Sequence, residues 1–128
     1  MTPEQLAERL EAAAHRIGPA IHRHMEHVGE LGRAQIRGHA SGRPGPNVIT
    51  GDYRNSWQVV NRRIPYGAQC TIGTDRPQGR RLEFGFVGTD SLGRTYAQPP
   101  FPHVQPSLAA ITAALRFGMR SAVEEILR

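Results

Sequence analysis

Four histidines lie close together near the start of the chain and raise the question of a metal site: His15, His22, His24 and His27. Imidazole is a common zinc ligand, and a structural zinc site needs several ligands that converge. On a helix, His15 and His22 share one side, whereas His24 and His27 lie well round from them. No three converge, so we expect solvated or core-edge histidines and no metal ligand.

Two Arg and His pairs with equal spacing are the next candidates for chemistry. Arg16 stands six residues before His22, and Arg33 stands six residues before His39. This spacing loosely resembles the paired Arg and His of helical ribonuclease toxins. Those families usually place a polar residue after the Arg, whereas apolar residues follow both arginines here. A small ribonuclease-like toxin is therefore the second alternative for function.

Other patterns of catalytic sites are missing from the sequence. There is no G-x-S-x-G, no glycine-rich phosphate loop, no H-E-x-x-H and no carboxylate pair placed for acid-base work. The three aspartates stand in turn-like surroundings, where a structural role is the default. We therefore expect a protein that is not an enzyme, with no catalytic residue, no cofactor-binding residue and no cofactor.

The basic residues are all arginine, and 16 of them against 11 acidic residues give a net charge of +5. The excess is concentrated between residues 38 and 106. Arginine pairs that would neutralise phosphates are Arg62-Arg63 and Arg80-Arg81. The strand pattern, however, points the nearby Trp57 inward as core rather than outward for base stacking. A basic nucleic-acid-binding protein is the first alternative, and a solvated surface is favoured over it.

A long amphipathic helix is predicted over residues 1–38. Thr2 is a natural N-cap, followed by Pro3 at the first helical position and by Gln5 three residues after the cap. Gly18-Pro19 interrupts the pattern and predicts a kinked helix or two helices in line. The apolar stripe of this helix consists of Leu6, Leu10, Ala14, Ile17, Ile21, Met25, Val28 and Leu31.

A small antiparallel sheet of three to four strands is predicted in the middle of the chain. Residues 38–47 form a Gly, Pro and Ser connector, and residues 48–52 form a tight turn that enters a first strand at 56–62. Further strands are expected at 69–73 and 81–86. The alternation in the last strand predicts that Phe84 and Phe86 are buried and that Glu83 faces away from the core.

A proline-rich arm and a final helix complete the expected α+β fold, as a single domain over residues 1–128 with its sheet and arm at 48–104. The arm carries Pro99, Pro100, Pro102 and Pro106, which lack the N–H that a sheet ladder requires, so it is predicted to be an edge or docking element. Ser107 is predicted to cap a helix over 107–128. Its inward stripe consists of Leu108, Ile111, Leu115, Met119, Ala122 and Ile126.

The composition predicts a protein that gains stability by assembly. Only 38% of the residues are apolar and 6% aromatic, which is low for a self-sufficient core. Cys70 is the single cysteine and is expected to be a buried thiol. No signal-peptide pattern and no apolar run of membrane-spanning length occur, so we expect a soluble protein made in a reducing cytoplasm, without a membrane partner.

Three separated segments are more specific together than any one alone. Thr50-Gly51-Asp52-Tyr53-Arg54-Asn55-Ser56 is similar to a T-G-x-L-R-x-S segment, Leu82-Glu83-Phe84-Gly85 to an E-F-G strand end, and Pro100-Phe101-Pro102 through Pro106 to a Pro-Phe arm. In this order they resemble a family of small head-tail joining, or tail-completion, proteins of long-tailed bacteriophages. Tyr53 replaces the usual leucine, Gly79-Arg80-Arg81 replaces the usual Tyr-Ala pair, and residues 86–97 match no part of the pattern.

The resemblance implies a structural virion protein of the phage neck, located between capsid and tail and made in the host cytoplasm. The implied partners are other copies of the chain, in a sixfold ring around a DNA channel, and neighbouring connector, tail-terminator or tail-tube proteins. The residues expected at interfaces are Thr50, Gly51, Arg54, Arg81, Glu83, Phe84, Gly85, Pro100, Phe101, Pro102 and Pro106.

Several of these residues also have a simpler structural interpretation. Thr50 and Gly51 suit a turn in which glycine adopts a positive φ. An outward-facing Glu83 would suit pairing with an arginine of a neighbouring copy, for which Arg54 and Arg81 are candidates. Phe101 would suit a hydrophobic anchor on a neighbouring ring.

Overall fold

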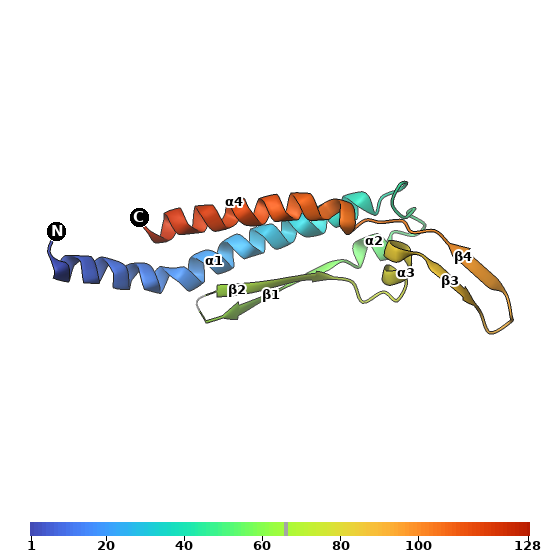
Figure 1. Ribbon diagram of the computed structural model, residues 1–128, viewed down its shortest axis with the longest axis horizontal. Helices are drawn as coiled ribbons and strands as arrows, with labels where there is room; N and C mark the ends of the chain where they lie inside the picture. Colours follow the sequence, from blue (N-terminus) through green and yellow to red (C-terminus); the bar gives the residue numbers. More distant parts are fainter. Residues whose placement is uncertain (66) are drawn as a thin grey trace.

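The computed structural model describes residues 1–65 and 67–128, and it has the predicted α+β class. Figure 1 shows an elongated molecule in which the two long helices lie side by side and a thin hairpin projects at the end opposite the N-terminus. In chain order, the elements are α1 (Pro3–His39), α2 (Asp52–Asn55), β1 (Gln58–Ile64), β2 (Gly67–Gly73), α3 (Gly79–Phe84), β3 (Phe86–Thr89), β4 (Thr95–Gln98), the short 3-10 helix η1 (Gln105–Ser107) and α4 (Leu108–Ile126).

Helix α1 begins with the predicted cap. The Thr2 hydroxyl accepts a hydrogen bond from the Gln5 N–H at 3.1 Å, and the Gln5 side chain accepts one from the Thr2 N–H at 2.9 Å. Pro19 lies inside the helix without ending it, so residues 3–39 form one helix rather than two. Figure 1 shows this helix bending along its first half, in agreement with the predicted kink.

Helices α1 and α4 run antiparallel and meet through small residues. Ala13 and Ala20 of α1 pack with Ile126 of α4, and Gly118 of α4 lies against Val28. The helix axes approach closely because these contact positions have little or no side chain. None of the helices formed by the described residues is long and apolar enough to cross a bilayer.

The predicted apolar stripes overstate this contact. Val28 is buried on α1, and Ala122 and Ile126 are buried on α4, as expected. The stripe members that are exposed instead are Leu6, Leu10 and Ala14 of the first helix, Leu31 nearer its end, and Leu108 and Leu115 of the last. The first turns of α1 extend beyond the end of α4 (Figure 1). Leu6 and Leu10 lie at this end of the molecule beside Leu127 and Arg128, which follow α4, and both are exposed.

Strands β1 and β2 form an antiparallel hairpin whose inner face packs on α1. Val59 of β1 and Cys70 of β2 both point at Gly29, where an added Cβ would lie 2.7 Å from Val59 and 2.6 Å from the Cys70 sulfur. Gly32 receives Ile72 in the same way. Cys70 is half-buried, and burial together with the Glu30 carboxylate raises the pKa of its thiol.

The predicted single sheet is wrong, because the structure contains two separate two-stranded sheets, β1–β2 and β3–β4. Residues 79–84 form helix α3, and Gly85 separates them from β3. A short apolar run such as Leu82 to Phe86 fits either structure by periodicity alone. The predicted turn at Thr50 to Asp52 likewise leads into helix α2, and the first strand begins only at Gln58.

Candidate interaction site

Glu83 accepts three backbone hydrogen bonds from the segment that leads into α4. Its carboxylate oxygens lie 2.8 Å from the His103 N–H, 3.0 Å from the Val104 N–H and 2.9 Å from the Gln105 N–H. The donors surround the start of η1, where backbone N–H groups have no partner within a helix. Partial burial would raise the pKa of Glu83, but the three donors and nearby His103 outweigh it and lower this pKa below its usual value.

His103 is fully buried beside this carboxylate. Its Nδ1 lies 3.0 Å from both the Phe101 carbonyl oxygen and a Glu83 carboxylate oxygen, and its Nε2 lies 2.5 Å from the Tyr53 hydroxyl. These contacts are satisfied when Nδ1–H donates and Nε2 accepts from the Tyr53 hydroxyl. The Trp57 ring packs edge-on against His103 at 5.7 Å.

The order tyrosine, histidine and glutamate is also that of a proton relay. Burial and the Glu83 charge raise the pKa of Tyr53 to about 12, so the phenol stays protonated near neutral pH. His103 has no exposed surface from which it could exchange a proton with a substrate. The geometry therefore favours a positioning role, in which these side chains join α2, α3 and the arm into one unit, which we call the clamp (Tyr53, Trp57, Glu83, His103 and Ser107).

Ser107 connects the clamp to the end of α1. Its hydroxyl donates to the His103 carbonyl oxygen at 2.6 Å and accepts from His39 Nδ1 at 2.8 Å. The predicted side-chain cap by Ser107 is therefore wrong: the side chain bonds within the clamp, and Glu83 binds the free N–H groups instead. Because Glu83, from a distant part of the chain, binds these N–H groups, α4 needs no local side-chain cap.

The proline-rich arm is largely built into the clamp rather than free. The Phe101 N–H donates to the Leu82 carbonyl oxygen of α3. Gly85 adopts φ +81°, and a Cβ there would lie 2.9 Å from the Gln98 carbonyl oxygen. The close approach of the arm to this glycine explains why a residue without a side chain is needed at the start of β3. Pro99 and Pro100 are exposed, Pro102 is half-buried, and Pro106 lies in η1.

The Thr50 to Ser56 segment has mainly structural contacts. Gly51 adopts φ +89°, as predicted for the turn, and the Thr50 hydroxyl accepts a hydrogen bond from the Asp52 N–H. Arg54 donates to the Ser41 hydroxyl at 3.4 Å. Ser56 is buried and shares a hydrogen bond with the Thr74 hydroxyl. The segment thereby fixes the connection between α1 and β1.

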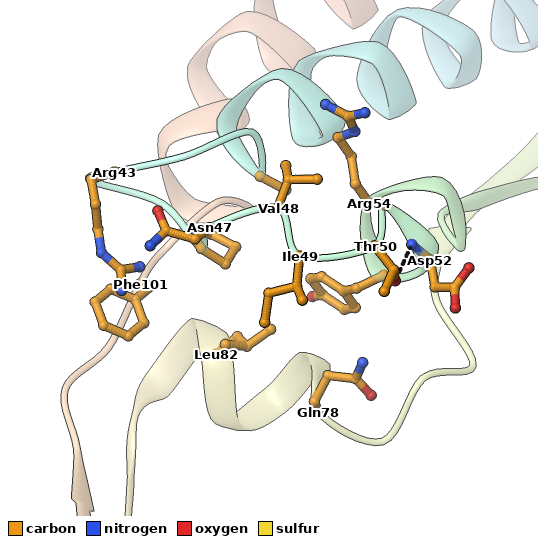
Figure 2. A pocket seen from close by; sticks show the side chains of 14 residues that line it. Arg43, Asn47, Val48, Ile49, Thr50, Asp52, Arg54, Gln78, Leu82 and Phe101 are labelled. Atoms are coloured by element: carbon orange, nitrogen blue, oxygen red, sulfur yellow. Dashed lines mark hydrogen bonds between the residues drawn. The ribbon is translucent and has the colours of Figure 1, made fainter.

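A cavity of about 540 Å³ opens beside the clamp, between the 40–51 loop, α2, α3 and the arm. Figure 2 shows Leu82 on one wall and the Arg43 side chain over the Phe101 ring at its edge, where the guanidinium carbon lies 3.7 Å from the ring centre. Thr50, Gly51 and Arg54 also line this cavity. Four of the expected interface residues thus converge here from separate parts of the chain.

The remaining expected interface residues do not join them. Arg81 stacks on the Phe86 ring at 4.0 Å, within the same chain. Phe84 is 74% exposed, so the prediction that it is buried is wrong, whereas Phe86 is half-buried. Glu83 faces inward, so the predicted outward orientation, from which an ion pair with a neighbouring copy was inferred, is also wrong.

The roles of Tyr53, His103 and Arg43 could not be predicted from the sequence. Each acts through a partner at least 50 residues away, as in the hydrogen bond between Tyr53 and His103 and the stacking of Arg43 on Phe101. The one available signal was Tyr53 itself, because it replaces the leucine of the resembling family with a side chain that donates a hydrogen bond.

The histidines and arginines of α1 have contacts of their own. His22 pairs with Glu26 at 2.8 Å, and His24 pairs with Glu125 of α4 at 3.1 Å. Within residues 1–65 and 67–128, no three His, Cys, Asp or Glu side chains come together as a metal site would require. Arg16 donates to the Ile126 carbonyl oxygen at 2.7 Å, and thus binds the last turn of α4.

Comparison of the chain with protein-family models, with curated proteins and with solved structures finds no match.

Proposed function

We propose that this chain is a structural protein of the neck of a long-tailed bacteriophage, which assembles with copies of itself and docks to the neighbouring proteins between head and tail. The proposal begins from the resemblance of the three segments at Thr50, Leu82 and Pro100. The α+β frame of a long helix, strands, arm and final helix accommodates all three, and it covers the whole chain.

The observation that carries the proposal is the difference between the exposed outer part of the β3–β4 hairpin and its fixed base. The β3–β4 hairpin stands away from the body with Val87 and Leu92 exposed, whereas Gly85 and Glu83 at its base are fixed against the arm by close contacts and hydrogen bonds (Figure 1). A projecting hairpin with a fixed base and exposed apolar side chains suits docking to another protein, because its direction is set before binding.

Apolar surface elsewhere supports the same proposal. A groove of about 700 Å³ between α1 and α4 is lined mainly by apolar side chains, including Val28, Leu31 and Phe117. Phe117 is 72% exposed and Ile49 is 94% exposed. Exposed apolar surface of this extent is typical of proteins that bind other proteins. A non-enzymatic role follows from the same proposal, since the best-organised polar cluster is a buried clamp.

Phage particles provide the test. Deleting the gene from the phage or prophage that encodes it should leave filled heads and separate tails in electron micrographs, and supplying the wild-type protein should restore joined particles. The matched variant replaces residues 87–97 with a short Gly-Ser turn between Phe86 and Gln98, which are paired across the hairpin. We expect it to fold but not to restore joining. Joined particles without the protein would overturn the proposal.

A further inference from the structure

Strand β2 is an edge strand with none of the usual protection. Its seven residues, Gly67–Gly73, include no charged residue and no proline. The opposite strand, β1, carries Arg62 and Arg63. Edge strands that stay unpaired are usually guarded by charges, prolines or bulges, because their free N–H and C=O groups bind other strands. By this criterion the β1 edge is protected from pairing, whereas the β2 edge is suited to pair with another strand.

Helix α1 leaves this edge free. It covers the inner face of the hairpin, where Val59 and Cys70 point at Gly29, while Gln69 and Thr71 on the outer face are exposed. Outside the ladder with β1, no described residue makes a backbone hydrogen bond to β2. The backbone groups of alternate residues of β2, which point away from β1, thus lack a protein partner among residues 1–65 and 67–128.

The β3–β4 hairpin also lacks neighbouring strands. Its strands, Phe86–Thr89 and Thr95–Gln98, carry no charge, and Arg94 at the turn is neutralised by Asp90 at 2.7 Å. Val87 lies opposite Ala97 on one face, and both are exposed. An isolated two-stranded hairpin is at best marginally stable in water and needs further strands or a packed face.

The β2 edge and the β3–β4 hairpin of one chain do not meet. The β1–β2 and β3–β4 sheets are separate, and Figure 1 shows the β3–β4 hairpin projecting away from the end of the β1–β2 sheet. Pairing therefore requires a second copy. We propose that the β3–β4 hairpin of one copy adds to the β2 edge of the next, which forms a four-stranded sheet across the subunit boundary.

This pairing accounts for the composition of both elements. Strand β2 becomes a central strand, where charges would be unfavourable, and the hairpin gains the additional strands that it needs. The contact joins two different surfaces, so a pair of copies retains one free hairpin and one free edge. Such heterologous contacts propagate until they close into a ring or continue as a filament. The inference rests on the proposed self-assembly and names its interface.

A matched pair of substitutions tests it in solution. Thr71 and Val60 are opposite each other in the β1–β2 ladder, and both side chains are exposed. Thr71→Lys places a charge on the β2 edge, and Val60→Lys places the same charge on the already guarded β1 edge. Both should fold as judged by circular dichroism. Thr71→Lys should weaken self-association at least about tenfold in analytical ultracentrifugation, and Val60→Lys should not.

Disulfide trapping gives the direct test of proximity. In a Cys70→Ser background, Gln69→Cys protein mixed with Val87→Cys protein should form a mixed disulfide under oxidation, whereas Val60→Cys mixed with Val87→Cys should not. Thr95→Cys serves as a second hairpin position if Val87→Cys fails to fold.

Several outcomes overturn the inference. These are equal association of both lysine variants, the absence of any trapped pair, or a wild-type protein that stays monomeric at all concentrations. None of them decides the neck function, which the particle experiment tests separately. Separate heads and tails in that experiment, combined with unchanged association of Thr71→Lys, would mean a neck protein that assembles through another surface.

Discussion

The clamp and the β3–β4 hairpin are neighbours in the chain but are built on opposite principles. The clamp buries polar groups and satisfies most of them, with Glu83 accepting three N–H groups and His103 bonded on both ring nitrogens, whereas Trp57 Nε1 has no hydrogen-bond partner among the described residues. The hairpin exposes apolar groups and buries little, with Val87 79% exposed. Stability should therefore depend on the first region and association on the second.

This contrast also changes the interpretation of the segments that resemble the phage family. The Glu83-Phe84-Gly85 and Pro100 to Pro106 segments were expected at an interface, yet their best-defined contacts hold the base of the hairpin. A sequence pattern shared among docking proteins can record the fixed support of a docking element. Under the proposed function, the docking surface would be residues 86–97, where the sequence does not match the pattern of the resembling family.

Removing the Glu83 carboxylate should have the largest effect on the clamp. Glu83→Ala leaves three backbone N–H groups without their acceptor at a side-chain position that is 9% exposed. We expect a loss of roughly 4 kcal/mol in the free energy of unfolding, because buried unpaired donors are costly. Urea denaturation measures it. Glu83→Gln keeps one acceptor oxygen, so its free energy of unfolding should fall clearly less. Equal losses in both variants would show that the hydrogen bonds of Glu83 do not determine the stability.

A side chain at Gly85 should have the next largest effect. Gly85→Ala requires an alanine at φ +81° and ψ 171°, and its Cβ would meet the Gln98 carbonyl oxygen at 2.9 Å. We expect a loss of about 3 kcal/mol from backbone strain and this contact. Gly93→Ala is the control, since Gly93 has φ +80° but open space around it. It should lose only about 1 kcal/mol in the same thermal or urea experiment.

Removal of the Tyr53 hydroxyl should have a smaller effect with a distinctive pH dependence. Tyr53→Phe leaves His103 Nε2 buried without a partner and should cost about 2 kcal/mol near neutral pH. The pKa of Tyr53 is raised from 10.0 to about 12, so the unfolded chain loses this proton first. Wild-type stability should fall as the pH rises from 10 to 12, and the difference between wild type and Tyr53→Phe should shrink there.

Acid should weaken the clamp through Glu83. Its pKa is lowered in the folded protein, so the unfolded chain takes up this proton at a higher pH. The contribution of the carboxylate is complete above the ordinary glutamate pKa of about 4.3 and is lost as the pH falls through the folded pKa. The stability difference between wild type and Glu83→Gln should therefore decrease below about pH 4.3. A difference that is constant down to lower pH would contradict this assignment.

The sequence predicted the elements of the fold better than their contacts. The Thr2 cap, the Gly51 turn and the two long helices follow from local rules, and the structure confirms them. The apolar stripes correctly indicated amphipathic helices. They could not show that α1 begins beyond the end of α4, because this depends on where two distant segments lie side by side.

The contacts of the clamp could not be predicted from the sequence for the same reason. The alternation of Leu82, Phe84 and Phe86 with polar or small residues predicts a strand that includes Glu83, but a short helix also tolerates this pattern. Its actual environment consists of N–H groups some 20 residues further along the chain. No local pattern encodes these donors, so neither the orientation of Glu83 nor the full burial of His103 could be read from the sequence.

Substitution on the hairpin should have the smallest effect on stability and thereby sharpen the contrast most. Val87→Ser removes an exposed apolar side chain that lies opposite Ala97 and is not part of the clamp. We expect a change of less than about 0.5 kcal/mol in the unfolding free energy of the monomer, as is usual for exposed positions. The same change should weaken association, because Val87 lies on the element proposed to be covered in the assembly. Urea denaturation at low concentration and sedimentation at high concentration measure the two quantities separately. A large loss of monomer stability would mean that the hairpin belongs to the same cooperative unit as the clamp, and the division between support and docking element would then fail.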